Sequence, residues 1–315
     1  MRVFVFGWYG HGNIGDDAFK LSFKQLWPDI DFTFDNHIPE DINDYDRLWI
    51  GGGSFLDQAI PNLQLVRIPI AFLGVGIDSV HGGNLEALRN AEVICRDPDS
   101  AKKLELYAPS AKGSISDLVF ARRDLQEVKD RCPVKQILVL VNDFLTPKGT
   151  EPDWKSLAYY WFLQEFAKVL GRFANDGYRI KMLPMCINSR VDDRRLAAAI
   201  IGRSLHPECY DWGLTPVTEA ELLTEMRRSE FMISQRFHGI VYGLLTETPC
   251  ITIKCHEKFD SLTSMLDLPV VDYYGFTDAN FELAKEDMLD FDFFSAREYC
   301  RVSFDAWHEV SKIMP

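Results

Sequence analysis

The amino-acid sequence predicts an α/β protein with two Rossmann-like domains that face a central cleft. Short apolar runs, rich in β-branched and aromatic residues, alternate with segments of helical apolar spacing. Glycines and charged residues gather directly after the predicted strands. The alternation breaks once, over residues 118–135, where the chain is charged, contains a proline and has no sustained apolar face. We therefore predict an N-terminal domain of residues 1–125 and a C-terminal domain of 134–315.

In the first domain each predicted strand is short and apolar, and two predicted helices carry apolar residues at helical spacing. Ser54, after a glycine triplet, is a candidate helix N-cap. The expected strands are 2–6, 31–35, 45–50, 69–78 and 91–95, and the expected helices are 16–27 and 97–107.

The second domain repeats the alternation. Its first long helix is amphipathic and is expected to end at Gly177. The acidic, aromatic C-terminal stretch predicts a helix near 304–313 that packs back across the domain junction. The expected strands are 136–143, 178–185, 230–233 and 249–255, and the other expected helices are 158–177, 192–205, 219–229 and 239–247.

Composition narrows the classes of function. The chain of 315 residues has a formal net charge of −13, which disfavours a general nucleic-acid binder because no basic surplus is present to neutralise phosphates. A small anionic ligand needs only a few local cations. The seven cysteines have no C-x-x-C spacing and are expected to be reduced thiols. The first apolar run, Val3 to Phe6, is too short for a signal peptide or a membrane span, so we expect a cytoplasmic protein with no integral membrane segment.

The stretch YGHGNIGDDAFK, residues 9–20, follows the first predicted strand. Its glycines permit close backbone approach, and a helix starting near Gly15 would direct N–H groups above the sheet edge. Asp16 and Asp17 would repel an anion, which favours a neutral, hydroxylated ligand. A plain turn with a helix start remains open, and so does a weak dinucleotide motif, G-H-G-N-I-G with Asp35 as the acidic residue.

Two further strand ends carry candidate site residues. GGGSFLD places Ser54 after a strand, and Arg96 follows the strand AEVIC. A turn capped by Ser54, and a structural network between Arg96 and Asp97, are the alternatives to a role in the cleft.

The segment SQRFHGIVYG is the sharpest signal. Arg236 and His238 come directly after a predicted strand, two residues apart. A guanidinium offers a planar fork for carboxylate or phosphate, and an imidazole can donate a proton near neutral pH. Gly239 begins an apolar stretch that predicts a buried helix with its N-terminus toward the same anion. A salt bridge for Arg236 and a satisfied core position for His238 are the structural alternatives.

The segment KCHEKF, residues 254–259, follows the next predicted strand. It supplies Lys254, His256 and Lys258. The two lysines either complete an anion pocket there or lie on a solvated loop. Cys255 beside His256 has no second ligand pair at useful spacing, so we expect no metal.

In their order along the chain these segments resemble the polysaccharide pyruvyl transferase family. The resemblance covers residues 1 to about 267 and rests on the following stretches: YGHGNIGDDAF, IGGGSFLD, GVGID, RDPDSAKKL, DLVF, ISQRFHGIVYGLLTETPCITI and HEKF.

The resemblance implies the two-domain architecture of GT-B-like glycosyltransferases and transfer of pyruvate from phosphoenolpyruvate to a sugar or glycan, without a cofactor. Carried over, Arg236 holds the donor and His238 protonates its enol carbon. The implied donor contacts are Arg236, Phe237, His238, Gly239 and Lys258 on the second domain, and the expected acceptor contacts are Gly12, Asn13, Asp16, Asp17, Ser54 and Arg96 on the first.

The chain departs from the family pattern at one donor position. Asn142 and Asp143 stand where the family often has an arginine, and a carboxylate opposes a trianionic donor. Two alternatives therefore stay open: a nucleotide-sugar-dependent glycosyltransferase in which Arg236 and Lys258 hold a diphosphate, and a non-catalytic glycan-binding relative.

Overall fold

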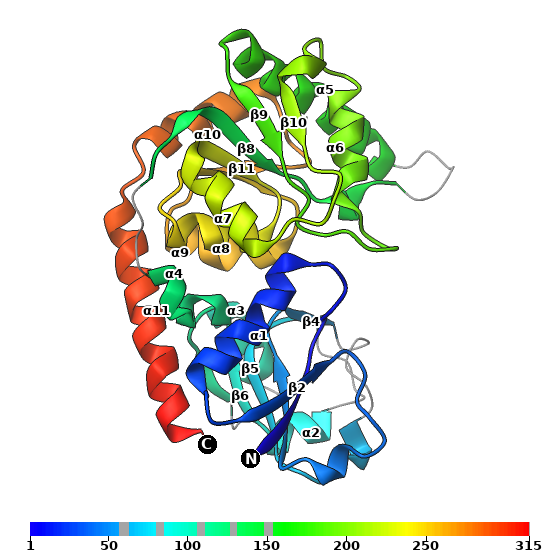
Figure 1. Cartoon of the computed structure of the whole chain (residues 1–315), viewed down its shortest axis with the longest axis vertical. Coiled ribbons are helices and arrows are strands. Elements are labelled where there is room, and N and C mark those ends of the chain that lie inside the picture. Colours follow the sequence, from blue (N-terminus) through cyan, green and yellow to red (C-terminus); the bar gives the residue numbers. More distant parts are fainter. Residues whose placement is uncertain (57–62, 80–84, 106–110, 127–130, 148–153, 315) are drawn as a thin grey trace. The chain divides into compact units, whose positions relative to one another are not determined.

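The computed structural model describes residues 1–56, 63–79, 85–105, 111–126, 131–147 and 154–314 (Figure 1). The chain forms two compact units. Unit 1 comprises Met1–Gly10, Gly15–Glu127 and Glu298–Pro315, and unit 2 comprises His11–Ile14 and Val128–Arg297. This division differs from the predicted 1–125 and 134–315 in two respects: the C-terminal residues group with the first unit, and four residues of the glycine-rich loop group with the second.

Unit 1 is built on a parallel sheet with the strand order β2-β1-β3-β5-β6-β7, and β4 pairs with β5. The direction of the strand order reverses between β1 and β3, and ligands of such sheets bind at the carboxyl ends beside that switch point. The strands are β1 Arg2–Phe6, β2 Asp31–Asp35, β3 Arg47–Gly51, β4 Ser54–Leu56, β5 Ile70–Ser79, β6 Glu92–Cys95 and β7 Ala111–Ser114; the α-helices are α1 Ile14–Leu26, α2 Leu85–Asn90, α3 Pro98–Glu105 and α4 Arg123–Gln126.

The last helix, α11 (Phe293–Ile313), is anchored to unit 1 by aromatic residues. Trp307 is fully buried, and its Nε1 donates to Ser116 Oγ at 3.2 Å. The ring of Tyr299 packs edge-on against Phe120 at 5.2 Å. The indole of Trp27 donates to the carbonyl of Met314 at 2.7 Å. These contacts explain why the C-terminal residues belong to unit 1.

Unit 2 is built on a parallel sheet with the order β10-β9-β8-β11-β12-β13. Counted within the unit this is the Rossmann order 3-2-1-4-5-6, whose switch point lies between β8 and β11. The strands are β8 Val134–Leu140, β9 Arg179–Met182, β10 Tyr210–Trp212, β11 Ser229–Ser234, β12 Cys250–Lys254 and β13 Val270–Asp272; the helices are α5 Trp154–Asn175, α6 Asp193–Ile201, α7 Glu219–Arg228, α8 Phe237–Leu245, α9 Asp260–Met265 and α10 Asp278–Leu289.

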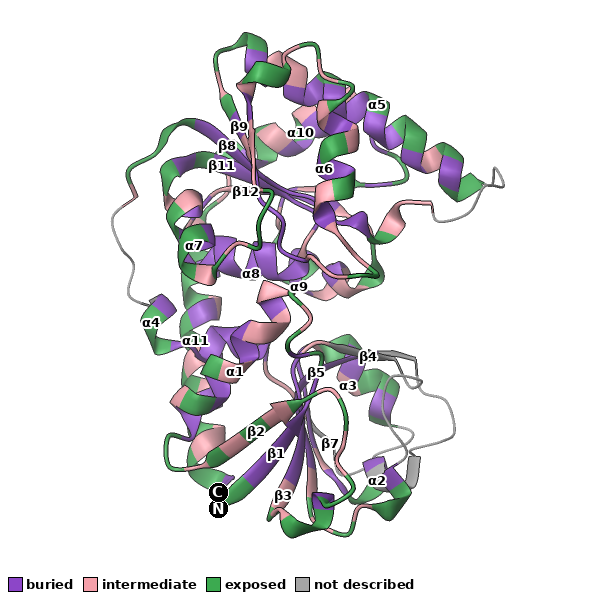
Figure 2. Ribbon diagram, turned by 45° about the vertical axis from the view of Figure 1, so that its right-hand side comes forward, coloured by how far each residue is buried: buried purple, intermediate pink, exposed green. Residues whose placement is uncertain are grey.

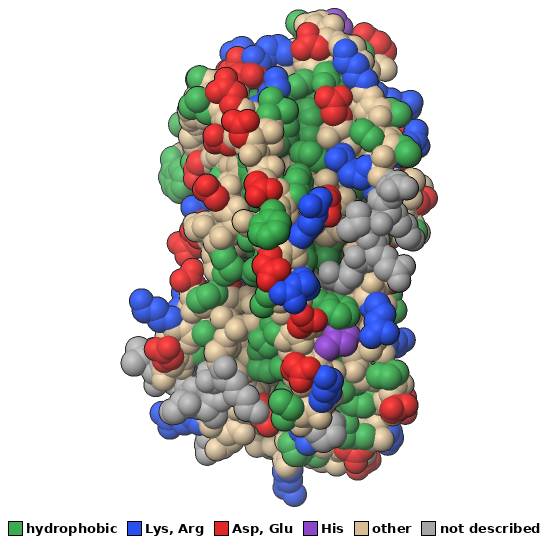
Figure 3. Space-filling view, turned by 90° about the vertical axis from the view of Figure 1, so that its left-hand side faces the viewer, with side chains coloured by type: hydrophobic (Ala, Val, Ile, Leu, Met, Phe, Trp, Pro, Cys, Tyr) green, Lys and Arg blue, Asp and Glu red, His purple; other side chains and the backbone are tan. Residues whose placement is uncertain are grey.

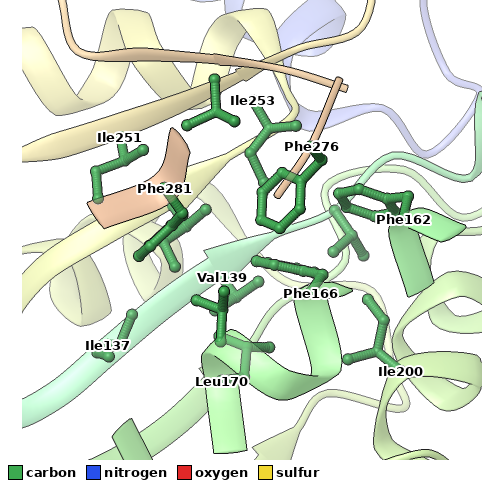
Figure 4. Close-up of a cluster of buried hydrophobic side chains, with 14 of the residues drawn as sticks. Ile137, Val139, Phe162, Phe166, Leu170, Ile200, Ile251, Ile253, Phe276 and Phe281 are labelled. Atoms are coloured by element: carbon green, nitrogen blue, oxygen red, sulfur yellow. The ribbon is translucent and has the colours of Figure 1, made fainter. Parts of the chain in front are cut away.

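The core of unit 2 lies between its sheet and the amphipathic helix α5. Side chains of α5, among them Phe162, Phe166 and Leu170, converge on Val139 of β8 and Ile253 of β12 (Figure 4). The apolar residues whose spacing predicts helix 158–177 therefore lie on the side of α5 that faces the sheet, as expected for a period of 3.6 residues.

Three local predictions are wrong. Ser54 begins strand β4 and does not cap a helix. Residues 118–121, which were predicted to lie in the connection between the domains, are fully buried in the 3₁₀ helix Leu118–Ala121. A single apolar turn is too short to show a repeating hydrophobic pattern, so its burial was not predicted. Helix α11 begins at Phe293 and not near 304. Within this helix, Arg301 forms ion pairs with Glu298 at 2.6 Å and with Asp305 at 3.0 Å.

Surface charges of both signs are interspersed on the face drawn in Figure 3. Within the described ranges, no helix combines the length and apolar character needed to cross a membrane. No disulfide joins the seven cysteines, all of which lie in described segments, and this confirms the expectation of thiols.

Candidate active site

The candidate site of unit 2 lies at the carboxyl edge of its sheet, beside the switch point between β8 and β11. Asn142 and Asp143 follow β8, and Gln235 and Arg236 follow β11. The two turns are joined directly, because the Asn142 N–H donates to Gln235 Oε1 at 3.0 Å and the Gln235 N–H donates to the carbonyl of Leu140 at 2.8 Å. The sequence-predicted residues of two strand ends are thus brought together.

Arg236 occupies the N-cap position of α8 in an extended conformation, with φ −107° and ψ 125°. Its Nε donates to the carbonyl of Val141 at 3.3 Å, and its Nη2 forms an ion pair with Oδ1 of Asp193. Only 12% of the Arg236 side chain is exposed, and that of Asp193 is fully buried. The salt bridge considered as the structural alternative is therefore present.

His238 is the second residue of α8 and is buried, and its ring lies edge-on to Phe237 at 5.7 Å. Every residue of α8 is buried, which confirms the predicted buried helix (Figure 2). Gly239 permits this packing: a Cβ there would lie 2.4 Å from Ser234 Oγ and 2.8 Å from Leu140 Cδ1. The glycine thus lets the first turn of α8 approach the ends of β11 and β8.

Asn142 and Asp143 have structural partners. The Asn142 side chain accepts from the Phe144 N–H at 3.0 Å and so caps the 3₁₀ turn Asp143–Leu145. Asp143 is fully buried, and its Oδ2 accepts from the Asp192 N–H at 3.2 Å. Arg195 Nη1 lies 3.5 Å from the same oxygen. The Asp143 carboxylate is therefore turned toward the start of α6 and balanced by a cation.

Lys258 lies in the 3₁₀ turn Glu257–Phe259 after β12, where its N–H donates to His256 Nδ1 at 3.2 Å. Burial raises the pKa of the neighbouring Cys255 thiol, and the charges of Lys258 and Arg236 oppose that rise. The Cys255 thiol donates to the carbonyl of Gln235 at 3.7 Å, so the turn after β12 contacts the turn after β11. Lys254 forms an ion pair with Asp260 at 2.6 Å.

The glycine-rich loop meets the turn after β9. The carbonyl of Gly12 accepts from the Ile187 N–H at 3.0 Å, and the Ile14 N–H donates to the carbonyl of Met185 at 3.0 Å. Asn13 forms an antiparallel bridge with Cys186. Gly12 has φ +64°, and a Cβ there would lie 2.5 Å from the Ile187 carbonyl oxygen. Only glycine fits this contact without strain.

The sequence did not predict Asp193 or the 185–187 turn as part of the site, because DDRR indicates only the start of a helix. The signal available was a pair of aspartates opening a helix directly after a strand and a turn. Within the described segments, no group of three or more His, Cys, Asp or Glu side chains is placed to hold a metal ion.

In unit 1, Asp16 and Asp17 lie in the first turn of α1, above the switch point between β1 and β3. Asp17 Oδ1 accepts from the Gly10 N–H at 3.0 Å and pairs with Lys20 at 2.6 Å. Burial, followed by the charges of Asp16 and Asp17, raises the pKa of Tyr9, whose hydroxyl donates to the carbonyl of Gly51 at 2.6 Å. The two aspartates are thus next to the loops after β1 and β3.

Arg96 is buried in unit 1 and takes part in the structural network considered as its alternative. Its Nε lies 3.4 Å from Asp97 Oδ2. Asp97 in turn accepts from the Ser100 N–H at 2.7 Å, at the start of α3. Ser54, at the start of β4, is paired by register with Gly76 of β5.

Comparison with solved structures shows the fold. Sucrose-phosphate synthase from Thermosynechococcus elongatus has 12% identity and a TM-score of 0.59 over 99% of this chain and 98% of its own. The UDP-GlcNAc 2-epimerase of Methanocaldococcus jannaschii has 11% identity and a TM-score of 0.53 over 96% and 99%. A glycosyltransferase from Rickettsia africae has 9% identity and a TM-score of 0.54 over 99% and 97%. These likenesses confirm the predicted GT-B-like α/β fold.

Comparison with curated protein sequences gave no significant match. Comparison with protein families matches residues 13–257, more than half of the chain, to the polysaccharide pyruvyl transferases. The match includes the loop at Asn13, Arg96, and the S-x-R-x-H segment that places Arg236 and His238 beside the switch point. The chain belongs to the polysaccharide pyruvyl transferase family.

Proposed function

We propose that the protein transfers pyruvate from phosphoenolpyruvate to two hydroxyls of a sugar in a glycan and so forms a pyruvate ketal. The observation that carries this proposal is the placement of Arg236 and His238, within a family match, at the start of a buried helix beside the switch point of unit 2. A fold alone would not support it, because function resides in the site.

Arg236 is suited to hold the donor. A guanidinium has five N–H donors, and in the described segments Arg236 donates through Nε to Val141 and through Nη2 to Asp193. It therefore has donor capacity left for a carboxylate or phosphate. The start of α8 at Phe237 adds a helix dipole that favours an anion.

In the proposed reaction His238 donates a proton to the methylene carbon of phosphoenolpyruvate. The adjacent carbon becomes electrophilic, and one sugar hydroxyl attacks it and returns its proton to His238. The bond from that carbon to the phosphate oxygen then breaks, and a second hydroxyl closes the ketal while its proton leaves with the phosphate. The sum is one phosphoenolpyruvate and two hydroxyls giving one ketal and one inorganic phosphate, with no redox change. A general acid positioned in this way typically accelerates a reaction by roughly 10²- to 10⁴-fold.

Charge balance assigns a role to Lys258. Arg236 is neutralised by its ion pair with Asp193. A trianionic donor therefore needs a second cation. Lys258 lies in the turn after β12, the strand that pairs with β11, and Cys255 of that turn donates to the carbonyl of Gln235 at 3.7 Å. We assign Lys258 to the donor side together with Arg236.

The test is a thermal-shift titration with phosphoenolpyruvate, UDP and GDP on the wild type and on Arg236→Lys. Lysine keeps a positive charge beside the buried Asp193, so the fold should survive. Because lysine lacks the planar fork of the guanidinium, the apparent affinity for phosphoenolpyruvate should fall at least tenfold. Arg194→Lys is the matched control, because Arg194 pairs with Asp192 and not with Asp193. Equal loss in both variants would contradict the assignment of Arg236.

A nucleotide-sugar-dependent glycosyltransferase is the second candidate, since the sheet order of unit 2 is the one found in dinucleotide-binding folds. Stabilisation by UDP or GDP but not by phosphoenolpyruvate would favour it. Glycan binding without release of phosphate from phosphoenolpyruvate would favour a non-catalytic relative. Phosphate release that requires a sugar acceptor would support pyruvyl transfer.

A further inference from the structure

Asp193 is the point at which four segments of unit 2 meet. Its Oδ1 accepts from Arg236 Nη2 and from the Asp143 N–H at 3.3 Å. Its Oδ2 accepts from the N–H groups of Met185 at 3.0 Å and Cys186 at 2.9 Å. The carboxylate is fully buried. One side chain therefore joins the end of β8, the turn after β9, the start of α6 and the arginine after β11.

The 185–187 turn is also the support of the glycine-rich loop. It exchanges backbone hydrogen bonds with Gly12 and Ile14, as described above. In addition, Asn188 Nδ2 donates to the carbonyl of His11 at 3.1 Å. The amides that bind Asp193 Oδ2 thus belong to the same turn that holds residues 11–14.

We propose that Asp193 is a positioning residue that sets Arg236 and the Gly12–Ile14 loop in one arrangement. Under the proposed function Arg236 contacts the donor. We assign Gly12 and Asn13, which the sequence predicts as acceptor contacts, to the acceptor, so one buried carboxylate aligns the two substrates. This inference rests on the proposed function for its kinetic consequence. Its structural part, the link from Asp193 to residues 11–14, stands on the hydrogen bonds alone.

Burial supports a positional role. A carboxylate with four N–H donors in the interior has a single low-energy orientation, and loss of its charge leaves Arg236 without its buried partner. Burial raises the pKa of Asp193, while Arg236 and the backbone donors oppose that rise. Substitution by asparagine keeps the size of the side chain but not its charge or four-acceptor pattern.

Asp192 provides a matched control one residue away. Its side chain caps α6 by accepting from the Arg194 N–H at 3.1 Å and pairs with Arg194 at 2.6 Å. Asparagine caps helices as well as aspartate does. Asp192→Asn therefore removes one charge at the same helix end without touching Arg236. Ile200→Val, in the core-facing side of α6, is a second control for simple destabilisation.

The test compares amide hydrogen exchange and ligand binding in these three variants. Asp193→Asn should raise exchange at least tenfold at Cys186, Ile187 and Ile14, and should weaken phosphoenolpyruvate binding and raise the acceptor KM about tenfold each. Both controls should leave the local exchange and the two constants within about twofold. Unchanged exchange at Ile14 and Ile187 would overturn the link, and changed exchange with unchanged donor and acceptor constants would overturn the alignment.

Failure of the proposed function and failure of the link from Asp193 to the loop give different results. If the wild type does not bind phosphoenolpyruvate, the proposed function fails, while the exchange data still decide the link from Asp193 to the loop. If Asp193→Asn does not fold, Gly12→Ala tests the link from the other end, because its Cβ would meet the Ile187 carbonyl. That variant should weaken donor binding as well as acceptor use, and an unchanged donor affinity would overturn the proposal.

Discussion

At the scale of single residues, Arg236 shows how a candidate donor ligand is held. Its guanidinium is fixed between the carbonyl of Val141 and the carboxylate of Asp193. The ion pair and a donor-binding role are compatible, because a guanidinium in a planar fork can serve a carboxylate on one edge and a ligand on another. The residue type was therefore predictable from the motif, while its partner was not.

His238 is predicted to act in the chemical step more than in binding. His238→Gln should lower kcat by roughly 10²- to 10⁴-fold, because glutamine cannot deliver a proton at neutral pH. The apparent affinity for phosphoenolpyruvate should change far less than in Arg236→Lys. Single-turnover phosphate release and thermal-shift titration measure the two effects. A variant with full kcat and weakened donor binding would contradict the role of acid.

Gly239 is predicted to be the glycine of α8 that tolerates substitution least. Gly239→Ala should lower the free energy of unfolding by about 1–3 kcal/mol, since the new Cβ meets Ser234 and the well-packed Leu140. Gly243→Ala is the control on the same helix. Its Cβ would lie 3.2 Å from the flexible end of Met232, so a smaller change is expected. Urea denaturation of both variants makes the comparison, and equal losses would contradict it.

At the scale of elements, strands β9 and β10 are joined on the surface by Asp211. Its carboxylate accepts from Lys181 at 2.9 Å and from Arg179 at 2.8 Å. The hydrogen bond from Lys181, opposed by partial burial, holds the pKa of Asp211 below its ordinary value of 3.8. The pair thus ties neighbouring strands at an edge of the sheet of unit 2.

This lowered pKa predicts the pH dependence of the contribution of Asp211. A carboxyl group whose pKa is lower in the folded state than in the unfolded chain stabilises the fold at pH values above its unfolded pKa. This stabilisation is lost as the pH falls through the folded pKa. The difference in urea midpoint between wild type and Asp211→Asn should therefore be constant from pH 7 to 5 and shrink below about 3.8. A Lys181→Met background should reduce the difference at pH 7. A difference that grows on acidification would contradict this account.

At the scale of the whole molecule, the two units have separate sheets and separate apolar clusters. Trp307, on helix α11, is buried in unit 1, although it follows the last residue of unit 2, Arg297, in the chain. Unit 1 is thus assembled from both ends of the sequence.

Trp307→Ala is predicted to destabilise unit 1 selectively, by about 3–5 kcal/mol for a large buried side chain. Amide exchange should rise in β1 and β5 and remain slow in β8 and β11, because local stability follows the core to which a segment belongs. Phe166→Ala, in the core of unit 2, should give the opposite pattern. Equal loss of protection in both sheets would show that the units unfold together.

Most of the regular elements could be predicted from local patterns. The period of α5 and the apolar runs of β8 and β11 are properties of neighbouring residues, and they predicted the elements of the core. The burial of 118–121 and the early start of α11 were missed, because one depends on tertiary packing and the other on ion pairs within a polar helix segment.

The α/β class, the family resemblance and the strand-end placement of Arg236 and His238 could be predicted from the sequence, because each follows from the order and spacing of residues along the chain. The pairing of Asp193 with Arg236 and the grouping of residues 11–14 with unit 2 became visible only in the folded chain. Those contacts link segments that are more than 40 or 170 residues apart. No local sequence pattern encodes contacts between segments so far apart in the chain. These contacts form because parallel strands and their connecting turns meet at one edge of the sheet.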